Sequence, residues 1–531
     1  MATNDRTLAA ALKAGFAALN AGDANAAAGH CREALTIDPK NPEAHFLVGL
    51  TALEMQDLKT ATSAFGSVTK LTPGHAAAWA QLARAFMRMG QPVRAEQALA
   101  QAVAADSKDP AVEDIIGLVS SLLGDQLAAR KWYSRAAEKA PDQPGYAVNL
   151  ANAMMFLGDT GAAEETLTAL LKKFGSIPQA EWLLSSIKKA DDGARADQLL
   201  ARAKQTADPA SSAFLAYAAG KEYEDCENWD AAFDAFETGA QSKRKTVEYK
   251  EAGEEAMFAA LREVFSPQWA AKSREGCDDP SPIFVVGQPR TGTTLIERII
   301  TSHSMVESAG ELQQFGLSVR RLAKGDWPER ISAEAVHATA DIDAKALGAE
   351  YLRASVPMRK GAPRFVDKLP GNYLNIPLIL AALPNARIVH LTRNPLDSCF
   401  SSYKQLFADA YLHSYDQAEM ARHHVRYAAL MNYWREVFPG RFLDISYEET
   451  VADVEPYARQ LIEFLGLAWE DACLEFYRRA DAVTTASAVQ VREKPHTRSV
   501  GRWRRYEQQL APMRAILSSA GLINEAGDSK T

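Results

Sequence analysis

A glycine-bounded loop with an arginine inside it is the first segment of the sequence that could bind a phosphate. The loop reads GQPRTGTT from Gly287 to Thr294, and it follows the apolar, largely β-branched run Ile283–Val286. The residues after it have apolar side chains at helical spacing. A strand, a glycine loop and a helix in this order point free backbone N–H groups and the positive end of a helix at an anion. The predicted anion-binding residues are Gln288, Pro289, Arg290, Thr291, Gly292, Thr293 and Thr294.

This loop differs at one position from the phosphate loop of nucleoside triphosphatases. Those proteins carry a lysine where this sequence has Thr293. A kinase or an ATPase needs that lysine, together with Mg²⁺, to neutralise the phosphoryl group in transfer. Arg290 is the cation that the loop offers instead, and it suits a ligand with fewer charges than a triphosphate. A nucleotide kinase or NTPase is therefore a disfavoured alternative, and a scaffold with an inactive domain is another.

A second segment combines an arginine and a serine eight residues apart. Arg387–Thr392 is predicted to be a strand, and Arg393 follows at its C-terminal end. A helix is predicted to begin after the Asn-Pro pair that comes next, which places Ser401 about two turns into it. Both side chains would then reach the same anion. The alternative is a strand-end arginine in a surface salt bridge.

Taken together and in this order, the two segments resemble those of sulfotransferases that use 3′-phosphoadenosine 5′-phosphosulfate (PAPS). The resemblance covers roughly residues 280 to 515. It implies that the Arg290 loop binds the 5′-phosphosulfate of PAPS and that Arg393 and Ser401 bind its 3′-phosphate. It also implies transfer of the sulfuryl group to a hydroxyl acceptor without a metal ion.

The general base of the implied reaction is predicted to be Glu311. It follows Arg290 by 21 residues in the segment SAGELQQF, a position similar to that of the catalytic glutamate in protein-tyrosine sulfotransferases. The alternative is a carboxylate that simply begins the next helix, where it would complement the helix dipole. His303, at the end of the predicted loop helix, is the rival base. The preferred acceptor is a tyrosine of a protein or peptide, and a saccharide or lipid hydroxyl is the alternative.

Two further residues are assigned from the same resemblance. Lys368 precedes Arg393 by 25 residues, near the position of a catalytic lysine, and would stabilise charge on the leaving oxygen. The alternative is an ion pair with Asp367. Tyr447 lies in Arg441–Thr450, which is predicted to be a strand, and it resembles a tyrosine near the adenine. A core aromatic is an equal alternative for Tyr447.

The segment VREKPHTRSVGRWRRYE, from Val491 to Glu507, concentrates positive charge near the C-terminus. Members of the resembled family close over the nucleotide with such a segment. Lys494, Ser499 and Arg502 are the candidate contacts to the nucleotide. A solvated basic surface is the alternative.

The first 180 residues contain a repeat with a period of 34. An alanine phase comprises Ala27, Ala61, Ala95, Ala129 and Ala163; a turn phase comprises Gly22, Gln56, Gly90, Gly124 and Gly158; a helix-ending phase comprises Pro39, Pro73, Ser107, Pro141 and Gly175. The turn phase ends one helix, the alanine phase marks the close approach of two helices, and the last phase ends the second helix. The pattern resembles the tetratricopeptide repeat, with a weaker continuation through Pro209 and a shifted copy around Ala232 and Phe236.

Stacked repeats form a solenoid whose groove commonly binds peptide, so a protein or peptide acceptor held by the repeats is predicted. A purely structural or dimerising arm is the alternative. The expected architecture is α + α/β: a solenoid over 1–270, a linker over 271–281, a sulfotransferase domain over 282–515 with a mainly parallel sheet, and a tail over 516–531. The nucleotide would lie at the C-terminal ends of the strands.

Composition sets broad limits on class and compartment. The net charge of −8 offers no general attraction for nucleic acid or anionic membranes. The five cysteines lie far apart without a CxxC pair, which argues against a disulfide framework and against a zinc site. With no signal peptide or membrane-spanning segment recognised in the sequence, a cytoplasmic location is predicted. Repeats joined to such a domain are typical of bacteria.

Overall fold

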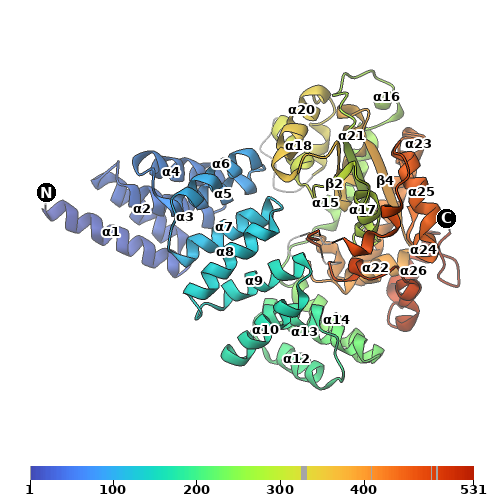
Figure 1. Cartoon of the computed structure of the whole chain (residues 1–531), viewed down its shortest axis with the longest axis horizontal. Coiled ribbons are helices and arrows are strands. Elements are labelled where there is room, and N and C mark those ends of the chain that lie inside the picture. Colours follow the sequence, from blue (N-terminus) through green and yellow to red (C-terminus); the bar gives the residue numbers. More distant parts are fainter. Residues whose placement is uncertain (1, 324–331, 408–409, 480, 486–487, 531) are drawn as a thin grey trace. The chain divides into compact units, whose positions relative to one another are not determined.

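Helical hairpins form the N-terminal half of the chain. The computed structural model describes residues 2–323, 332–407, 410–479, 481–485 and 488–530. The first helices, coloured blue to cyan in Figure 1, are α1 (Ala2–Asn20), α2 (Ala24–Ile37), α3 (Pro42–Glu54), α4 (Leu58–Leu71), α5 (Ala76–Arg88), α6 (Pro92–Ala104), α7 (Pro110–Leu122), α8 (Gln126–Lys139) and α9 (Pro144–Leu157). The helices that follow are α10 (Thr160–Phe174), α11 (Pro178–Ile187), α12 (Ala194–Gln205), α13 (Pro209–Asp225), α14 (Trp229–Arg244), α15 (Glu251–Val264) and α16 (Pro267–Ala270).

The three phases of the 34-residue repeat have the structural roles that the sequence predicted. All five residues of the turn phase have a positive φ, and Gln56 adopts this conformation (φ 61°) although it is not a glycine. All five alanines of the alanine phase are completely buried. Pro39 and its counterparts each follow the end of a second helix. The repeated geometry confirms a solenoid of the tetratricopeptide type.

The shifted copy of the repeat near residue 232 is also present. Glu227 adopts a positive φ of 57° in the turn between α13 and α14. Ala232 and Phe236, which follow that turn in α14, are both buried. Gly220 lies so close to the ring of Phe236 that an added Cβ would be 2.5 Å from it. The α13–α14 pair is therefore packed like the earlier hairpins.

The C-terminal half contains a five-stranded parallel sheet of order β2-β3-β1-β4-β5. The strands are β1 (Pro282–Gly287), β2 (Val306–Ser308), β3 (Arg364–Asp367), β4 (Arg387–Thr392) and β5 (Leu443–Ser446). Because β1 lies between β3 and β4, the loop after β1 and the loop after β4 leave the same edge of the sheet from neighbouring strands. The mainly parallel sheet expected from the sequence is confirmed.

Helices cover both faces of this sheet. They are α17 (Thr293–Thr301), α18 (Gln314–Leu322), α19 (Ala333–His337), α20 (Ala344–Ser355), α21 (Ile376–Ala382), α22 (Pro395–Tyr403), α23 (Gln417–Val437), α24 (Tyr447–Ala452), α25 (Val454–Phe464) and α26 (Ala511–Ser519) (Figure 1). Ile283 and Val285 of β1 pack with residues of α17 and α25. Phe284, between them, points to the other face and contacts Phe315 of α18. The period of two in a buried strand thus fills two separate cores.

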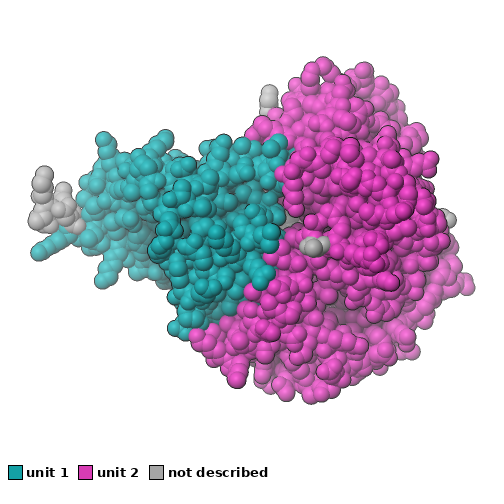
Figure 2. Space-filling view, in the orientation of Figure 1, with its two compact units in different colours: residues 1–153, 354–358 teal, residues 154–353, 359–531 magenta. Residues whose placement is uncertain are grey.

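The chain divides into two compact units, which Figure 2 colours separately. One comprises residues 1–153 and 354–358, and the other comprises residues 154–353 and 359–531. Helices α10 to α16 therefore belong to the same unit as the sheet, so the compact units do not follow the sequence-based boundary at 270. That boundary stays a prediction about repeat and domain families.

The C-terminal residues are packed against the domain. Part of the expected tail belongs to α26, and Ile523 is buried in the core cluster that also contains residues of α13, α14 and α22. Ile523 forms an isolated antiparallel bridge with Ser529. None of the helices in the described part of the chain is both long and apolar enough to cross a lipid bilayer.

Candidate active site

The loop after β1 has the backbone geometry of an anion cradle. Arg290 has a φ of 64° and Gly292 has a φ of 101°, both in the left-handed region. The Thr291 hydroxyl donates to the carbonyl of Gln288 at 2.7 Å and braces the turn. Gly292 is the N-cap of α17, and as a glycine it has no side chain with which to cap the first amides of that helix. A left-handed loop that leads into a helix N-terminus without a side-chain cap from its N-cap residue favours a bound anion.

Gly292 is required here by the close approach of Tyr447. A Cβ on Gly292 would lie 2.4 Å from Cδ2 of the Tyr447 ring. The guanidinium of Arg393 lies 4.6 Å from the centre of the same ring. Tyr447 therefore links the phosphate loop to Arg393 by packing and by a cation–π contact.

Arg393 is held at the junction of three segments. One Nη atom donates to the carbonyl of Arg290 at 2.6 Å and lies 3.4 Å from the hydroxyl of Ser401. The other donates to the carbonyl of Ser499 at 2.6 Å. Its buried Nε–H finds no acceptor among the described residues. The structure thus brings together the two segments that the sequence predicted to bind one ligand, and it leaves a donor unused.

The positive charges of this pocket repel one another. Burial and the nearby charge of Arg393 lower the pKa of Arg290 to about 10. Arg290 also lies 3.3 Å from the side-chain oxygen of Gln490. A dianionic group beside the two guanidiniums would relieve this repulsion.

A cavity of about 670 Å³ lies at the C-terminal ends of β4 and β5. Arg393, Ser446, Glu448, Val500 and Arg504 contribute to its lining. Its size falls in the range of small-molecule pockets, and one wall is the pocket-facing Arg393. The anion pocket therefore adjoins a space large enough to accommodate more of a ligand.

Glu311 and Lys368 form an ion pair. The Lys368 side chain is 1% exposed, whereas that of Glu311 is 39% exposed. Glu311 lies in the turn between β2 and α18, three residues before that helix begins, so it does not open the helix. A solvent-accessible carboxylate is thus held beside a buried ammonium, which suits a base next to a charge stabiliser.

Asp367, the alternative partner of Lys368, has other contacts. Its carboxylate accepts hydrogen bonds from the Leu312 amide at 3.3 Å and from the Tyr351 hydroxyl at 2.9 Å. Burial, reinforced by the charge of Glu311, raises the pKa of Asp367 to about 8. Asp367 is therefore largely uncharged at neutral pH and leaves the pairing of Lys368 to Glu311.

Sequence reasoning did not identify Glu297, which also lies near Lys368. This residue of α17 is buried and accepts a hydrogen bond of 2.5 Å from Ser308. Burial raises its pKa, while the charge of Lys368 acts in the opposite direction. Its position four residues after Thr293, on the same helix face, was the signal available in the sequence.

His303, the rival base, is used structurally at both ring nitrogens. Nε2 lies 2.7 Å from the carbonyl of Ala468, and Nδ1 accepts from the Met305 amide at 3.1 Å. The ring is 3% exposed. No nitrogen of His303 remains available to an acceptor hydroxyl.

A second unpredicted network supports the loop at Gln288. The Gln288 amide lies 3.2 Å from Nε2 of His423, and Nδ1 of His423 lies 2.8 Å from Glu254 of α15. Arg426 donates to the same carboxylate at 2.6 Å. Helix α15 thereby braces the phosphate loop through a histidine, a link that no local sequence pattern indicates.

Within the described residues, one group of three side chains has the composition of a metal site: Glu254, His413 and His423. The two imidazoles are stacked, with centres 3.5 Å apart and planes 11° apart. A metal ion lies in the plane of each imidazole that ligates it, and two nearly parallel planes cannot share one ion. Because Arg426 also neutralises Glu254, the group fits an ion-pair network better than a metal centre.

The three candidate residues of the basic segment near the C-terminus differ in their contacts. The carbonyl of Ser499 contacts Arg393, and Arg502 forms an ion pair with Glu224 at 3.0 Å. Lys494 is exposed, and its ammonium lies 5.9 Å from the centre of the Tyr477 ring. The contact of Lys494 with a nucleotide stays a prediction.

The predicted strand over Arg441–Thr450 is wrong in its second half. The strand ends at Ser446, whose hydroxyl accepts a hydrogen bond from the Glu449 amide and caps α24. Tyr447 therefore stands in the first turn of a helix, because a serine three residues before a glutamate begins a helix more readily than it continues a strand.

Comparison with known proteins finds matches to both parts of the chain. Residues 282–471 match the sulfotransferase family, and residues 52–118 match the tetratricopeptide repeat. The C-terminal half of the chain is thus similar to the sulfotransferase family. The match begins at the first residue of β1 and includes the Arg290 loop, the Glu311–Lys368 pair, Arg393 and Tyr447.

Several curated proteins are similar to this chain at low identity. An uncharacterized protein of Aquifex aeolicus is 31% identical over 412 residues, which are 74% of this chain and 52% of that protein. The protein-tyrosine sulfotransferase of Drosophila melanogaster is 24% identical over 232 residues, 42% of this chain and 46% of the relative. Protein-tyrosine sulfotransferase A of Caenorhabditis elegans is 24% identical over 39% of this chain and 55% of the relative. The chain thus spans about half the length of each of these curated relatives.

Two solved structures are among those similar to this chain. The sulfotransferase domain from the curacin biosynthetic pathway is 18% identical, covers 47% of this chain and 99% of its own, and has a TM-score of 0.32. A thermophilic tetratricopeptide-repeat protein of Thermus thermophilus is 20% identical, covers 34% of this chain and 98% of its own, and has a TM-score of 0.31. Scores this low carry no information about function.

Proposed function

We propose that this chain transfers the sulfuryl group of PAPS to a hydroxyl acceptor, preferably a tyrosine of a protein or peptide, with Glu311 as the base. The observation that carries the proposal is the contact of Arg393 with both Ser401 and the backbone of Arg290. It joins two anion-binding segments into one pocket within the region that matches the sulfotransferase family. The match of that region to the family supports sulfuryl transfer as the reaction.

The residues of the pocket fit PAPS, which supplies an already activated sulfuryl group. The N-terminus of α17, which begins at a glycine, and the left-handed loop at Arg290 suit the 5′-phosphosulfate. Arg393 and Ser401 suit the 3′-phosphate, and the buried Nε–H of Arg393 offers a donor that no described residue uses. The cavity beside Arg393 provides room for the rest of the nucleotide.

In the proposed mechanism Glu311 accepts the proton of the acceptor hydroxyl. Its exposed carboxylate pairs with Lys368, and a solvent-accessible carboxylate can take up a proton from a bound hydroxyl. Lys368 keeps an ammonium in a buried position, where its interaction with developing negative charge is strong. In this mechanism Glu311 removes the proton, and Lys368 and Arg290 stabilise the negative charge that develops on the leaving group.

The preference for tyrosine rests on the distant relatives named protein-tyrosine sulfotransferases. The solenoid supports a protein or peptide acceptor, because stacked repeats expose an extended groove. A cytoplasmic location and a bacterial source, expected from the sequence, are part of the same proposal.

The test is incubation of the full chain with radiolabelled PAPS and a tyrosine-containing peptide, beside the same peptide with phenylalanine in place of tyrosine. Label in the first peptide alone supports the proposal. A parallel incubation uses radiolabelled PAPS and a cell lysate in place of the peptides. Label that appears only in the saccharide or lipid fraction of that lysate contradicts the tyrosine preference. Tighter calorimetric binding of Mg²⁺-ATP than of adenosine 3′,5′-bisphosphate contradicts the assignment to PAPS and favours an NTPase.

A further inference from the structure

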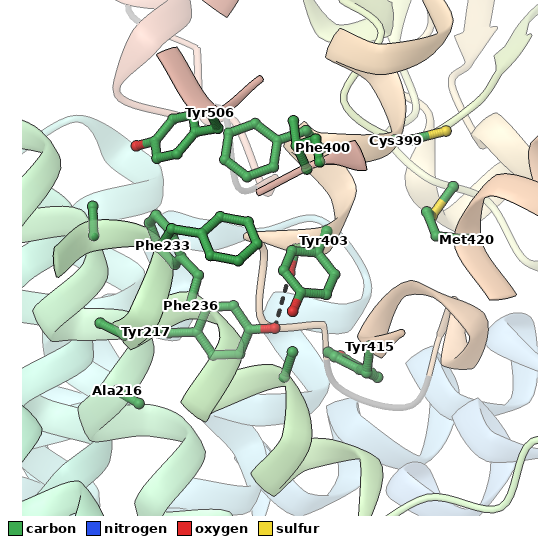
Figure 3. Packing of buried hydrophobic residues seen from close by; sticks show 14 of the residues in the cluster. Ala216, Tyr217, Phe233, Phe236, Cys399, Phe400, Tyr403, Tyr415, Met420 and Tyr506 are labelled. Atoms are coloured by element: carbon green, nitrogen blue, oxygen red, sulfur yellow. Dashed lines mark hydrogen bonds between the residues drawn. The ribbon is translucent and has the colours of Figure 1, made fainter. Parts of the chain in front are cut away.

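A helix of the repeat region packs directly on the helix that carries Ser401. Phe233 of α14 stacks against Phe400 and Tyr403 of α22, with ring centres 6.5 and 6.2 Å apart. The Tyr217 hydroxyl of α13 donates to the carbonyl of Tyr403 at 2.9 Å, the dashed line in Figure 3. Tyr506 completes this aromatic cluster, with its ring 4.5 Å from that of Phe400. The end of α22 is thus fixed by the repeat helices.

At this junction α13 places a buried carboxylate between two cations. The two oxygens of Glu224 accept hydrogen bonds from the Lys404 ammonium at 2.8 and 2.9 Å. Arg502 lies 3.0 Å from one oxygen, and the Tyr506 hydroxyl donates to the other at 2.6 Å. The Glu224 side chain is only 9% exposed. A carboxylate with this many donors is fixed in position.

Each of the two cations lies three positions after a residue that contacts Arg393. Lys404 follows Ser401 by three residues at the end of α22, and the charge of Arg290 acts on it. Arg502 follows Ser499, whose carbonyl contacts Arg393, by three residues. The buried Nε–H of Arg502, like that of Arg393, has no acceptor among the described residues. Arg393 and Arg502 thus each keep one guanidinium donor to which an anionic ligand could offer an acceptor.

We propose that Lys404 is a further anion-binding residue of the PAPS pocket and that Glu224, supplied by the repeat region, is its positioning residue. This inference rests on the proposed function. It means that the helical repeats are part of the nucleotide site and that the catalytic domain needs α13 for full affinity.

Charge explains why Lys404 needs this partner. Burial lowers the pKa of Lys404 to about 8, with Glu224 opposing and the charges of Arg502 and Arg290 adding to the decrease. Phe236 and Phe400 supply the other nearby groups, which are aromatic rings without charge. If Glu224 loses its charge, burial and the two arginines act unopposed, and Lys404 becomes neutral at a lower pH. A neutral amine binds a phosphate far more weakly than an ammonium does.

The decisive experiment is calorimetric titration of the full chain with adenosine 3′,5′-bisphosphate at pH 7.5 and at pH 6.0. Each variant is compared with the wild type at the same pH, which removes the titration of the ligand itself. For Glu224→Gln the affinity is expected to fall about 10-fold at pH 7.5, the effect of one charged hydrogen bond, and to return to within about 3-fold at pH 6.0. Glu227→Gln changes an exposed carboxylate two residues after α13 and should have no effect at either pH.

Two further variants keep the test independent of the stability of Glu224→Gln. Lys404→Met should lose about 10-fold in affinity at both pH values, whereas Lys404→Arg should bind like the wild type at both. Unchanged affinity of Lys404→Met for the bisphosphate overturns the inference. A loss of affinity in Glu224→Gln that persists at pH 6.0 also overturns it, and so does tighter binding by Glu224→Gln. A wild type that binds neither PAPS nor the bisphosphate contradicts the proposed function instead, whatever the variants do.

Discussion

The guanidinium of Arg393 donates a hydrogen bond of 2.6 Å to the backbone carbonyl of Arg290, a residue 103 positions earlier in the chain. This bond joins the loop after β1 to the end of β4 at the same edge of the sheet. The side chain of Arg393 thereby supports the loop that contains Arg290. The arrangement also concentrates positive charge that an anionic ligand would compensate.

Replacing Arg393 tests whether this pocket senses a ribose phosphate. For Arg393→Ala we expect the affinity for adenosine 3′,5′-bisphosphate to fall about 100-fold, while that for adenosine 5′-monophosphate falls much less. Titration calorimetry on both ligands measures the difference. Arg387→Ala, at the exposed start of the same strand, is the control. Equal losses for the two ligands would remove Arg393 from the 3′-phosphate site.

Replacing Glu311 separates proton removal from nucleotide binding. For Glu311→Gln we expect turnover to fall by about 10²- to 10⁴-fold, with the affinity for adenosine 3′,5′-bisphosphate almost unchanged. Lys368→Met should also reduce turnover, and the double variant should lose less than the product of the two single effects because the residues form one ion pair. Turnover near that of the wild type in Glu311→Gln would show that another group takes the proton.

The buried Asp367 should make stability depend on pH. Its pKa is about 8 in the fold, against an ordinary value of about 4, so the folded state binds the proton more tightly than the unfolded state does. Stability conferred by the protonated form is therefore lost as the pH rises from about 4 to about 8. Asp367→Asn cannot ionise, and its unfolding free energy should exceed that of the wild type by an amount that grows by a few kcal/mol over this range.

Denaturant unfolding at several pH values measures this difference. Asp341→Asn changes an exposed carboxylate and should shift neither curve. A difference between Asp367→Asn and the wild type that stays constant from pH 5 to pH 8 would contradict the raised pKa.

The turn phase of the repeat predicts opposite effects at two positions. Gln56 has a φ of 61°, which is strained for a residue with a Cβ, so Gln56→Gly should stabilise its hairpin by about 0.5–1 kcal/mol. Gly124 has a φ of 88° and open space where a Cβ would lie, so Gly124→Ala should destabilise its hairpin by about 1 kcal/mol through backbone strain alone. Amide hydrogen exchange in α3 to α4 and in α7 to α8 reports each local change. Effects of the same sign would contradict this explanation.

Local patterns in the sequence were sufficient for much of the fold. The left-handed turns at Gly22 and Gly90 and the buried contacts at Ala61 and Ala95 follow from steric demands that recur every 34 residues. The strand before Arg393 and the helix that carries Ser401 also follow from residue type and spacing. These features depend on interactions between residues close in the chain, which a periodic pattern records. The end of β5 was mispredicted because Ser446 both continues the apolar alternation and caps a helix.

By itself, then, the sequence determined the repeat and the glycine loop, and it supplied Arg393, Ser401, Glu311 and Lys368 as candidate site residues. Only the tertiary structure decided that Lys368 pairs with Glu311 rather than Asp367, and that Glu224 joins Lys404 across 180 residues of chain. The division into compact units near residue 153 was decided there as well. The physical reason is that burial and ion pairing depend on which distant surfaces meet, and one sequence carries no periodic signal for such contacts.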